Sequence, residues 1–229
     1  WSRWISERYG SLAEAEKDWG MPVPRRDGKV TSPPSGQFSE DGPWRVMVAA
    51  YRRFMDDLMS RKWNDARQKL RRMDPHHLIS FRQGNLYPLD FTLTATPKHV
   101  DFFSMEGYAF RPGGTGPNVA GFVNRYIHFT TGGKPHLWME FGANAWNEAS
   151  MRPGERELAS QADAHELIYR AALRTGAKGA APWWWAGGYR VSEKSDFGIL
   201  NPDGTLRPSG RLLQQYAERF QTPRDYPKS

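Results

Sequence analysis

Short apolar strands alternate with longer amphipathic segments along this chain of 229 residues, and that order restricts the fold more than any other feature. Four strands are expected, at Leu78–Phe81, Val100–Met105, Pro135–Met139 and Gly179–Trp185. Helices are expected at Ser2–Trp19, Asp41–Arg72, Asn118–Phe129, 155–175 and Arg207–Phe220. Strands that alternate with helices predict βαβ units and a parallel sheet. A closed (β/α)8 barrel needs eight such units, so the sequence predicts an α/β fold, the C-terminal half of a TIM barrel.

Local signals set several helix ends. Ser11 is expected to cap a helix after a break near Tyr9-Gly10, with Glu14 three residues on completing a capping box. Gly176 is placed to end the fourth helix, and Pro208 to lie in the first turn of the last one. Residues 21–37 are rich in proline, glycine and serine and are expected to form a loop.

The segment His136–Trp146 places a carboxylate, Glu140, at the expected end of an apolar strand. A buried carboxylate is costly unless it is paired, and active sites on β/α barrels lie at the carboxyl ends of the strands. Glu140 is therefore the first candidate for a catalytic group. The competing interpretation is a structural carboxylate paired with an arginine.

Composition limits the partners and cofactors. The chain has no cysteine, which excludes disulfides and thiolate metal sites, and its six histidines lack the spacing of a metal site. No phosphate loop or dinucleotide fingerprint occurs, so no cofactor is expected. No apolar run is long enough for a membrane span. The net charge of +7 comes from scattered Lys and Arg, which is more typical of solvated helix faces than of a nucleic-acid interface.

Tryptophan is in excess, with ten residues and a run of three at Trp183-Trp184-Trp185. Tryptophan serves either as core mass or as a stacking surface for flat ligands and sugar faces. In a regular strand Trp183 and Trp185 would share one side and Trp184 would point to the other. At least one of the three is expected to pack in the core.

Three segments resemble the retaining glycoside hydrolases that use two catalytic glutamates on a (β/α)8 barrel. The segment VDFFSMEGYAF resembles their sixth strand, WMEFGANAW the seventh and GAAPWWWAGGYR the eighth. The resemblance implies that Glu140 is the nucleophile, that Tyr108 contacts it, and that Trp183 or Trp185 forms the floor of the sugar site. It implies hydrolysis of a β-linked glycoside or polysaccharide with retention of configuration.

The opening residues 1–20 resemble the helix that follows the acid/base Asn-Glu pair in this clan. The resemblance thus implies one half-barrel unit over residues 1–229, with strands five to eight and their helices in 78–222. The first four strands and the acid/base glutamate would belong to an N-terminal half outside this chain, its expected partner. The pair Asn147-Glu148 follows the nucleophile strand and does not match the acid/base position.

Further substrate-binding candidates are Arg82, Asn85 and Glu106, which lie near the ends of the expected strands. Glu106 stands where this clan often has a histidine or another polar residue. It is open to three interpretations: a ligand of a sugar hydroxyl, a partner of Arg82, or an alternative nucleophile. Two other functions stay open: a non-catalytic carbohydrate-binding protein on the same scaffold, and a basic nucleic-acid-binding protein.

Overall fold

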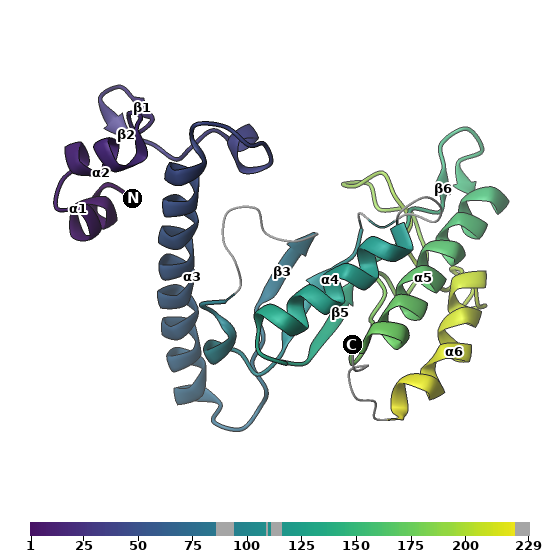
Figure 1. Ribbon diagram of the computed structural model, residues 1–229. Coiled ribbons are helices and arrows are strands. Elements are labelled where there is room, and N and C mark those ends of the chain that lie inside the picture. The colour runs from purple at the N-terminus through teal and green to yellow at the C-terminus, as the bar shows by residue number, and fades with distance from the viewer. Residues whose placement is uncertain (86–93, 109, 111–115, 223–229) are drawn as a thin grey trace. The chain divides into compact units, whose positions relative to one another are not determined.

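The computed structural model describes residues 1–85, 94–108, 110 and 116–222, apart from the side chains of Gln83, Asn85 and Pro117. These residues form two compact units (Figure 1). The first comprises Trp1–His77 and Pro88–His99, and the second comprises Leu78–Tyr87 and Val100–Ser229. None of the helices in the described part of the chain combines the length and apolar composition that a membrane crossing requires.

The first unit is mainly helical. Its elements in chain order are α1 (Ser2–Tyr9), α2 (Leu12–Trp19), the hairpin β1–β2 (Arg25–Arg26 and Lys29–Val30), η1 (Ser35–Phe38), α3 (Arg45–Met73) and η2 (Pro97–His99). The expected break near Tyr9-Gly10 is confirmed, because Gly10 ends α1 with φ 82°. Ser11 then caps α2, its Oγ accepting a hydrogen bond of 3.1 Å from the Glu14 amide.

An aromatic cluster packs the first unit. The Trp1 ring stacks on Trp4 at 5.4 Å and on Trp19 at 5.8 Å, and its edge meets Tyr51 at 5.2 Å. Trp4 and Trp19 are buried together with Ile5. Part of the excess tryptophan therefore serves as core mass in this unit.

A parallel sheet organises the second unit. Its strands β3 (Arg82–Asn85), β4 (Phe103–Glu106) and β5 (His136–Glu140) are hydrogen-bonded in the order β3-β4-β5. The predicted parallel pairing is confirmed, with Ser104 opposite both Arg82 and Leu137. The register of β4 against β5 shifts after Met105, and this shift places Glu106 opposite Glu140, so two carboxylates end neighbouring strands at one level.

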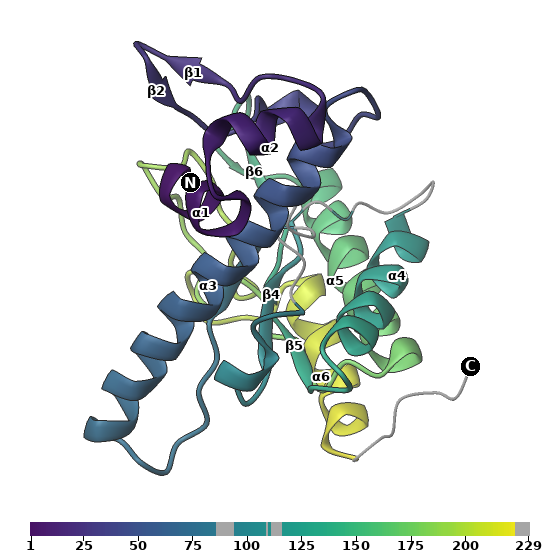
Figure 2. The same ribbon diagram turned by 60° about the vertical axis from the view of Figure 1, so that its left-hand side comes forward.

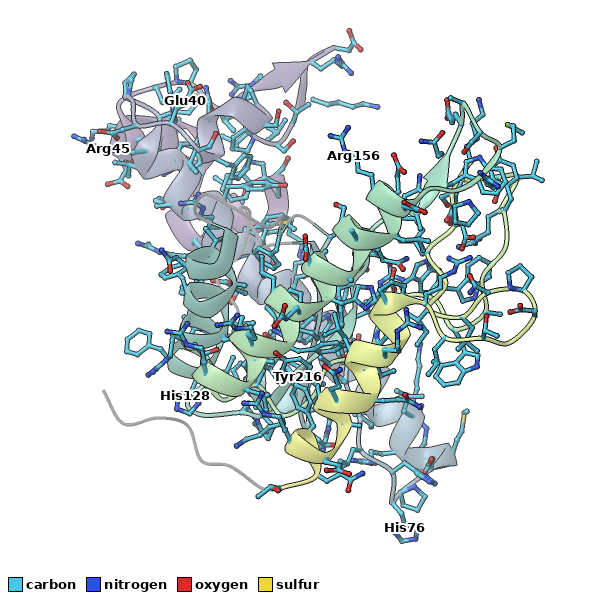
Figure 3. All side chains as sticks on the ribbon, turned by 90° about the vertical axis from the view of Figure 1, so that its right-hand side faces the viewer. Glu40, Arg45, His76, His128, Arg156 and Tyr216 are labelled. Carbon is cyan, nitrogen blue, oxygen red and sulfur yellow. The ribbon has the colours of Figure 1, made fainter. Side chains whose placement is uncertain are left out.

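Three helices pack together beside this sheet (Figure 2). They are α4 (Gly116–Thr130), α5 (Glu155–Thr175) and α6 (Pro208–Gln221), each within a few residues of its predicted bounds. Figure 3 shows α5 between α4, which carries His128, and α6, which carries Tyr216. Gly176 ends α5 in the left-handed conformation, as expected. A short hairpin, β6–β7 (Trp146–Asn147 and Arg152–Pro153), precedes α5.

The predicted strand at Leu78–Phe81 is wrong, because the strand begins only at Arg82. Both backbone groups of Ile79 are hydrogen-bonded to Asp101. The Ile79 amide donates to the Asp101 carboxylate at 2.8 Å, and the Ile79 carbonyl accepts from the Asp101 amide at 2.7 Å. These two hydrogen bonds to Asp101 take the place of regular strand pairing at Ile79. The next strand is also displaced, so Glu106 lies within β4 rather than after it.

The predicted strand at Gly179–Trp185 is wrong as a continuous element. Only Ala180 forms a parallel bridge, with Trp138 of β5. Pro182 has no amide hydrogen and cannot continue a ladder, although the Trp183 amide still donates to the Phe141 carbonyl at 2.7 Å. The described residues therefore form part of a barrel-like sheet and no closed barrel.

His165 is a buried histidine in α5. Its side chain is inaccessible, and its ring packs against Phe141 at 5.1 Å and Tyr169 at 6.1 Å. Neither ring nitrogen has a hydrogen-bond partner among the described residues. Burial lowers the pKa of His165 to about 4, so the folded protein holds it neutral.

Acid should therefore destabilise this unit through His165. The unfolded chain takes up a proton near pH 6.5 and the folded chain only near pH 4, so stability is lost as the pH falls through that window. The loss should reach about 3 kcal/mol. Denaturant unfolding of the full-length protein from pH 7 to 4 should show a proton uptake that His165→Leu reduces by about one. An unchanged pH dependence in the variant would contradict this assignment.

Candidate active site

Charged side chains gather where the parallel strands end. Glu106 is the last residue of β4 and Glu140 the last of β5, while Arg82 opens β3. The sequence predicts Arg82 after the end of its strand; Arg82 is instead the first residue of β3, and its long side chain still reaches both carboxylates. The sheet pairing therefore brings the two acids together, and the Arg82 side chain reaches them from the level of Ser104.

Two side chains hold the Glu140 carboxylate, one at each oxygen. The Tyr108 hydroxyl donates to Oε1 at 2.9 Å, and Arg82 Nη1 lies 3.5 Å from Oε2. The Arg82 Nε is also paired with Glu106 Oε1. Glu106 is the more buried acid, with 6% of its side chain exposed against 15% for Glu140. Glu140 is thus oriented at both oxygens and keeps access to solvent.

Tyr108 is a neutral donor in this arrangement. Burial raises its pKa above the ordinary value, and the hydrogen bond and charge of Glu140 raise it further, with smaller effects from Glu106 and Glu193. The phenol therefore keeps its proton across the working range of an enzyme. It can donate to Glu140 without competing with it for a proton.

Two glycines allow the backbones around Glu140 to approach closely. A Cβ on Gly107 would lie 3.1 Å from Trp138 Cε3 and 3.2 Å from Phe141 Cβ. A Cβ on Gly142 would lie 2.6 Å from the Trp183 carbonyl oxygen. Gly107 therefore lets β4 place Glu106 and Tyr108 beside β5, and Gly142 lets the tryptophan segment approach the residue after Glu140.

The two tryptophan candidates, Trp183 and Trp185, lie in different environments. Trp183 is half-buried, and its amide is hydrogen-bonded to the carbonyl of Phe141, so its backbone lies beside the residue that follows Glu140. Trp185 is 65% exposed, and none of its described contacts joins it to Glu140. The expected alternation is wrong, because Trp183 and Trp184 stack at 6.1 Å with an interplanar angle of 22° instead of pointing to opposite sides. Alternation requires a regular strand, and this segment is not one.

Two other candidates need brief comment. Asn85 ends β3, and its side chain lies outside the described residues. No metal site is formed in the described part of the chain, where no group of three or more His, Asp or Glu side chains is placed to hold an ion.

A buried ion pair that was not predicted fixes the loop behind the tryptophans. Arg207 Nη2 lies 2.7 Å from Asp196 Oδ2 and Nη1 lies 2.9 Å from Oδ1, with both side chains buried. The Asp196 amide donates to Asn144 Oδ1 at 2.8 Å, and the Ala145 amide donates to the Asp196 carbonyl at 2.8 Å. This loop is thereby tied to the loop that follows Glu140. In the sequence, Asp196 and Arg207 lie on either side of the turn residues Asn201 and Gly204, and this spacing was the available signal for the ion pair.

Loss of Arg82 should leave a buried carboxylate without its cation. We expect Arg82→Met to lower the free energy of unfolding by about 2 kcal/mol, less than a fully buried pair because Arg82 is largely exposed. Combined with Glu106→Gln it should cost less than the sum of the single changes, since the uncompensated charge is gone. Denaturant titration of the four proteins measures this coupling.

Arg170→Met is the matched control, because Arg170 is an exposed arginine whose ion pair with Glu166 measures 3.8 Å. It should change stability by less than about 0.5 kcal/mol. Additive effects of Arg82→Met and Glu106→Gln would show that the two side chains do not depend on each other.

Comparison with known proteins gives a family. Residues 1–222 match the sequence model of glycoside hydrolase family 42, described as β-galactosidase. No curated protein matches. A polyextremophilic β-galactosidase from the Antarctic haloarchaeon Halorubrum lacusprofundi is similar at 17% identity and a TM-score of 0.64, over 100% of this chain and 36% of that one.

Two further solved structures share the fold. The β-galactosidase of the psychrophilic Marinomonas ef1 has 14% identity and a TM-score of 0.65, over 96% of this chain and 35% of that one. The agarase AgWH50C has 15% identity and a TM-score of 0.64, over 96% and 32%. This chain spans about a third of the length of each. The match of the family model over 222 residues shows that the chain belongs to glycoside hydrolase family 42.

Proposed function

We propose that this chain carries the nucleophile side of the active site of a retaining glycoside hydrolase that acts on β-linked galactosides. One observation carries the proposal: a carboxylate at the end of a parallel strand, Glu140, is held at both oxygens by Tyr108 and Arg82 and remains open to solvent. Membership of a family described as β-galactosidase supports the substrate class.

Glu140 acts as the nucleophile in this proposal. Its carboxylate attacks the anomeric carbon while a second carboxyl group, about 5–5.5 Å away, protonates the departing oxygen. The sugar is then esterified to Glu140. The second group next removes a proton from water, the water attacks the anomeric carbon, and the ester bond breaks to regenerate the carboxylate. Tyr108 and Arg82 keep the attacking oxygens oriented and stabilise Glu140 as it leaves.

Glu106 serves as the partner of Arg82 rather than as the nucleophile. It is the more buried of the two acids, and the Arg82 Nε engages it directly. Burying two carboxylates at one level is costly whatever their role, so a site that keeps both favours catalysis over the alternative of a non-catalytic carbohydrate-binding protein. Glu106 nevertheless remains the second candidate for the nucleophile.

The acid/base group lies in a further part of the barrel in this proposal. The strand β3 is the outer strand of the described sheet, and its free side pairs with no strand in the described residues. An open parallel edge of this kind is normally covered. We therefore propose that an N-terminal half-barrel pairs with this edge and supplies the acid/base glutamate.

Removing the proposed nucleophile should abolish turnover in a way that a small anion can repair. Glu140→Ala in the full-length protein should lower kcat by several orders of magnitude, because no covalent intermediate can form. Added azide should then enter the vacated space and yield a glycosyl azide of inverted configuration. Steady-state kinetics with an aryl β-galactoside and NMR of the product measure both effects.

Glu106→Ala is the matched control, since it deletes the neighbouring carboxylate. It should lower activity without giving an azide adduct. Tyr108→Phe should cost less than Glu140→Ala, about ten- to a hundredfold, because Tyr108 orients the nucleophile and forms no bond. An azide product from Glu106→Ala, and none from Glu140→Ala, would reassign the nucleophile.

Residues 1–229 expressed alone should aggregate or unfold without a cooperative transition, because a parallel edge and apolar surface would face water. Addition of the N-terminal half should rescue solubility together with galactosidase activity. Analytical ultracentrifugation and thermal unfolding test this expectation. A soluble monomer with one sharp transition would refute the half-barrel proposal.

A further inference from the structure

A guanidinium lies over the Trp183–Trp184 pair, whose backbone is hydrogen-bonded to the residue after Glu140. The Arg190 Cζ lies 4.2 Å from the centre of the Trp184 ring and 5.5 Å from that of Trp183. The two indoles are themselves stacked. A planar cation over an indole face is attracted by the electron-rich ring, and more strongly when water is excluded. Arg190 is therefore a contact of both rings.

Arg190 is itself held by two residues further along the same loop, Glu193 and Ser195. Its Nη1 lies 2.9 Å from Glu193 Oε2, and its amide donates to the Ser195 carbonyl at 2.8 Å. The Ser195 hydroxyl donates to the same Glu193 oxygen at 3.3 Å. Only 26% of the Arg190 side chain is exposed. The Arg190 guanidinium is held by the Glu193 carboxylate and the two indole rings, and the Arg190 backbone is held by Ser195. The guanidinium therefore has little freedom to move away from the tryptophans.

This arrangement is connected to the nucleophile by short contacts. The Trp183 amide donates to the carbonyl of Phe141, the residue after Glu140, and the Trp184 amide donates to the Phe197 carbonyl at 3.3 Å. The Phe197 ring meets the Tyr108 ring edge to face at 5.9 Å. Tyr108 in turn donates to Glu140. Backbone hydrogen bonds thus hold the Trp183–Trp184 segment beside the nucleophile strand, whereas the contacts of Arg190 are with the two indole rings.

We propose that Arg190 is a positioning residue of the sugar site, fixing the Trp183–Trp184 pair in the orientation in which a sugar ring stacks on it, with Glu193 holding Arg190 in place. This rests on the proposed function for its substrate. Arg190 does not touch the reacting atoms. Its loss should weaken the binding of the sugar more than it slows the chemical step, because the stacking surface is displaced and Glu140 is not.

Arg190→Met in the full-length protein tests the proposal, since methionine keeps an unbranched apolar stem and removes the charge. We expect KM for an aryl β-galactoside to rise about tenfold with kcat changed less than about threefold. The near-UV circular dichroism of the stacked indoles should lose amplitude. Arg190→Lys should restore part of both, because it keeps the charge and loses the planar contact.

Glu193→Gln provides a milder second variant that keeps the shape of the side chain. It should raise KM in the same direction by a smaller factor. Arg174→Met is the matched control: Arg174 lies in the last turn of α5, and its loss should leave KM, kcat and the dichroism unchanged. Changed dichroism with unchanged KM in Arg190→Met would overturn the proposal and reduce Arg190 to a structural contact of the loop.

The dichroism and direct sugar binding separate this proposal from the proposed function. If the full-length protein hydrolyses no glycoside, the hydrolase proposal fails, and the dissociation constant for galactose by calorimetry replaces KM. A weaker constant in Arg190→Met would then still support the positioning role. Equal constants in the wild type and in Arg190→Met, or no binding by either, would refute it.

Discussion

The site depends on one guanidinium shared by two carboxylates. In the parallel register Glu106 stands opposite Glu140, so the backbone alone brings two negative charges together at one edge of the sheet. Without compensation this would oppose folding, since like charges in a poorly hydrated place repel and lose their solvation. Arg82 contacts both acids, and Tyr108 adds a neutral donor to the outer one. The close backbone approach at Gly107 is what makes this geometry possible.

A second ion pair, between Asp196 and Arg207, holds the loops that adjoin the site. Asp196 and Arg207 are fully buried, and a buried pair of this kind stabilises little by itself because both ions lose water. The contribution of the Asp196–Arg207 pair is to fix the positions of the loops that it joins. Arg207 also donates to the Gly198 carbonyl at 2.9 Å, while Asp196 is bonded to the loop after β5. The segment that carries Trp183 and Trp184 is therefore held against the nucleophile strand by polar contacts with defined directions, where apolar packing alone would permit several.

The sequence predicts the helices and the position of Glu140 at the end of a strand well, and the bounds of the short strands poorly. Helical periodicity extends over many residues and is reinforced by caps such as Ser11 and Gly176, so its signal survives tertiary context. A strand of four residues carries almost no period, and one competing contact can move it, as Asp101 does at Ile79. Pro182 breaks a ladder that an apolar run suggests. The division into two compact units depends on contacts between residues far apart in the chain, which no local pattern contains. Asp196 and Arg207 are only 11 residues apart, but their burial depends on the packing around them and not on the local sequence.

The charges around the site also bear on the chemistry. Three carboxylates of the described residues, Glu106, Glu140 and Glu193, act on Tyr108. Their cationic partners are Arg82 for the first two and Arg190 for Glu193. One negative charge is thus left in excess. In the proposed reaction the sugar passes through a transition state with positive charge on the ring. Fixed negative charge placed beforehand in a site of restricted solvation stabilises that state more than it stabilises the neutral substrate. The charge excess that makes this edge of the sheet costly to fold is therefore the property that glycoside hydrolysis would use.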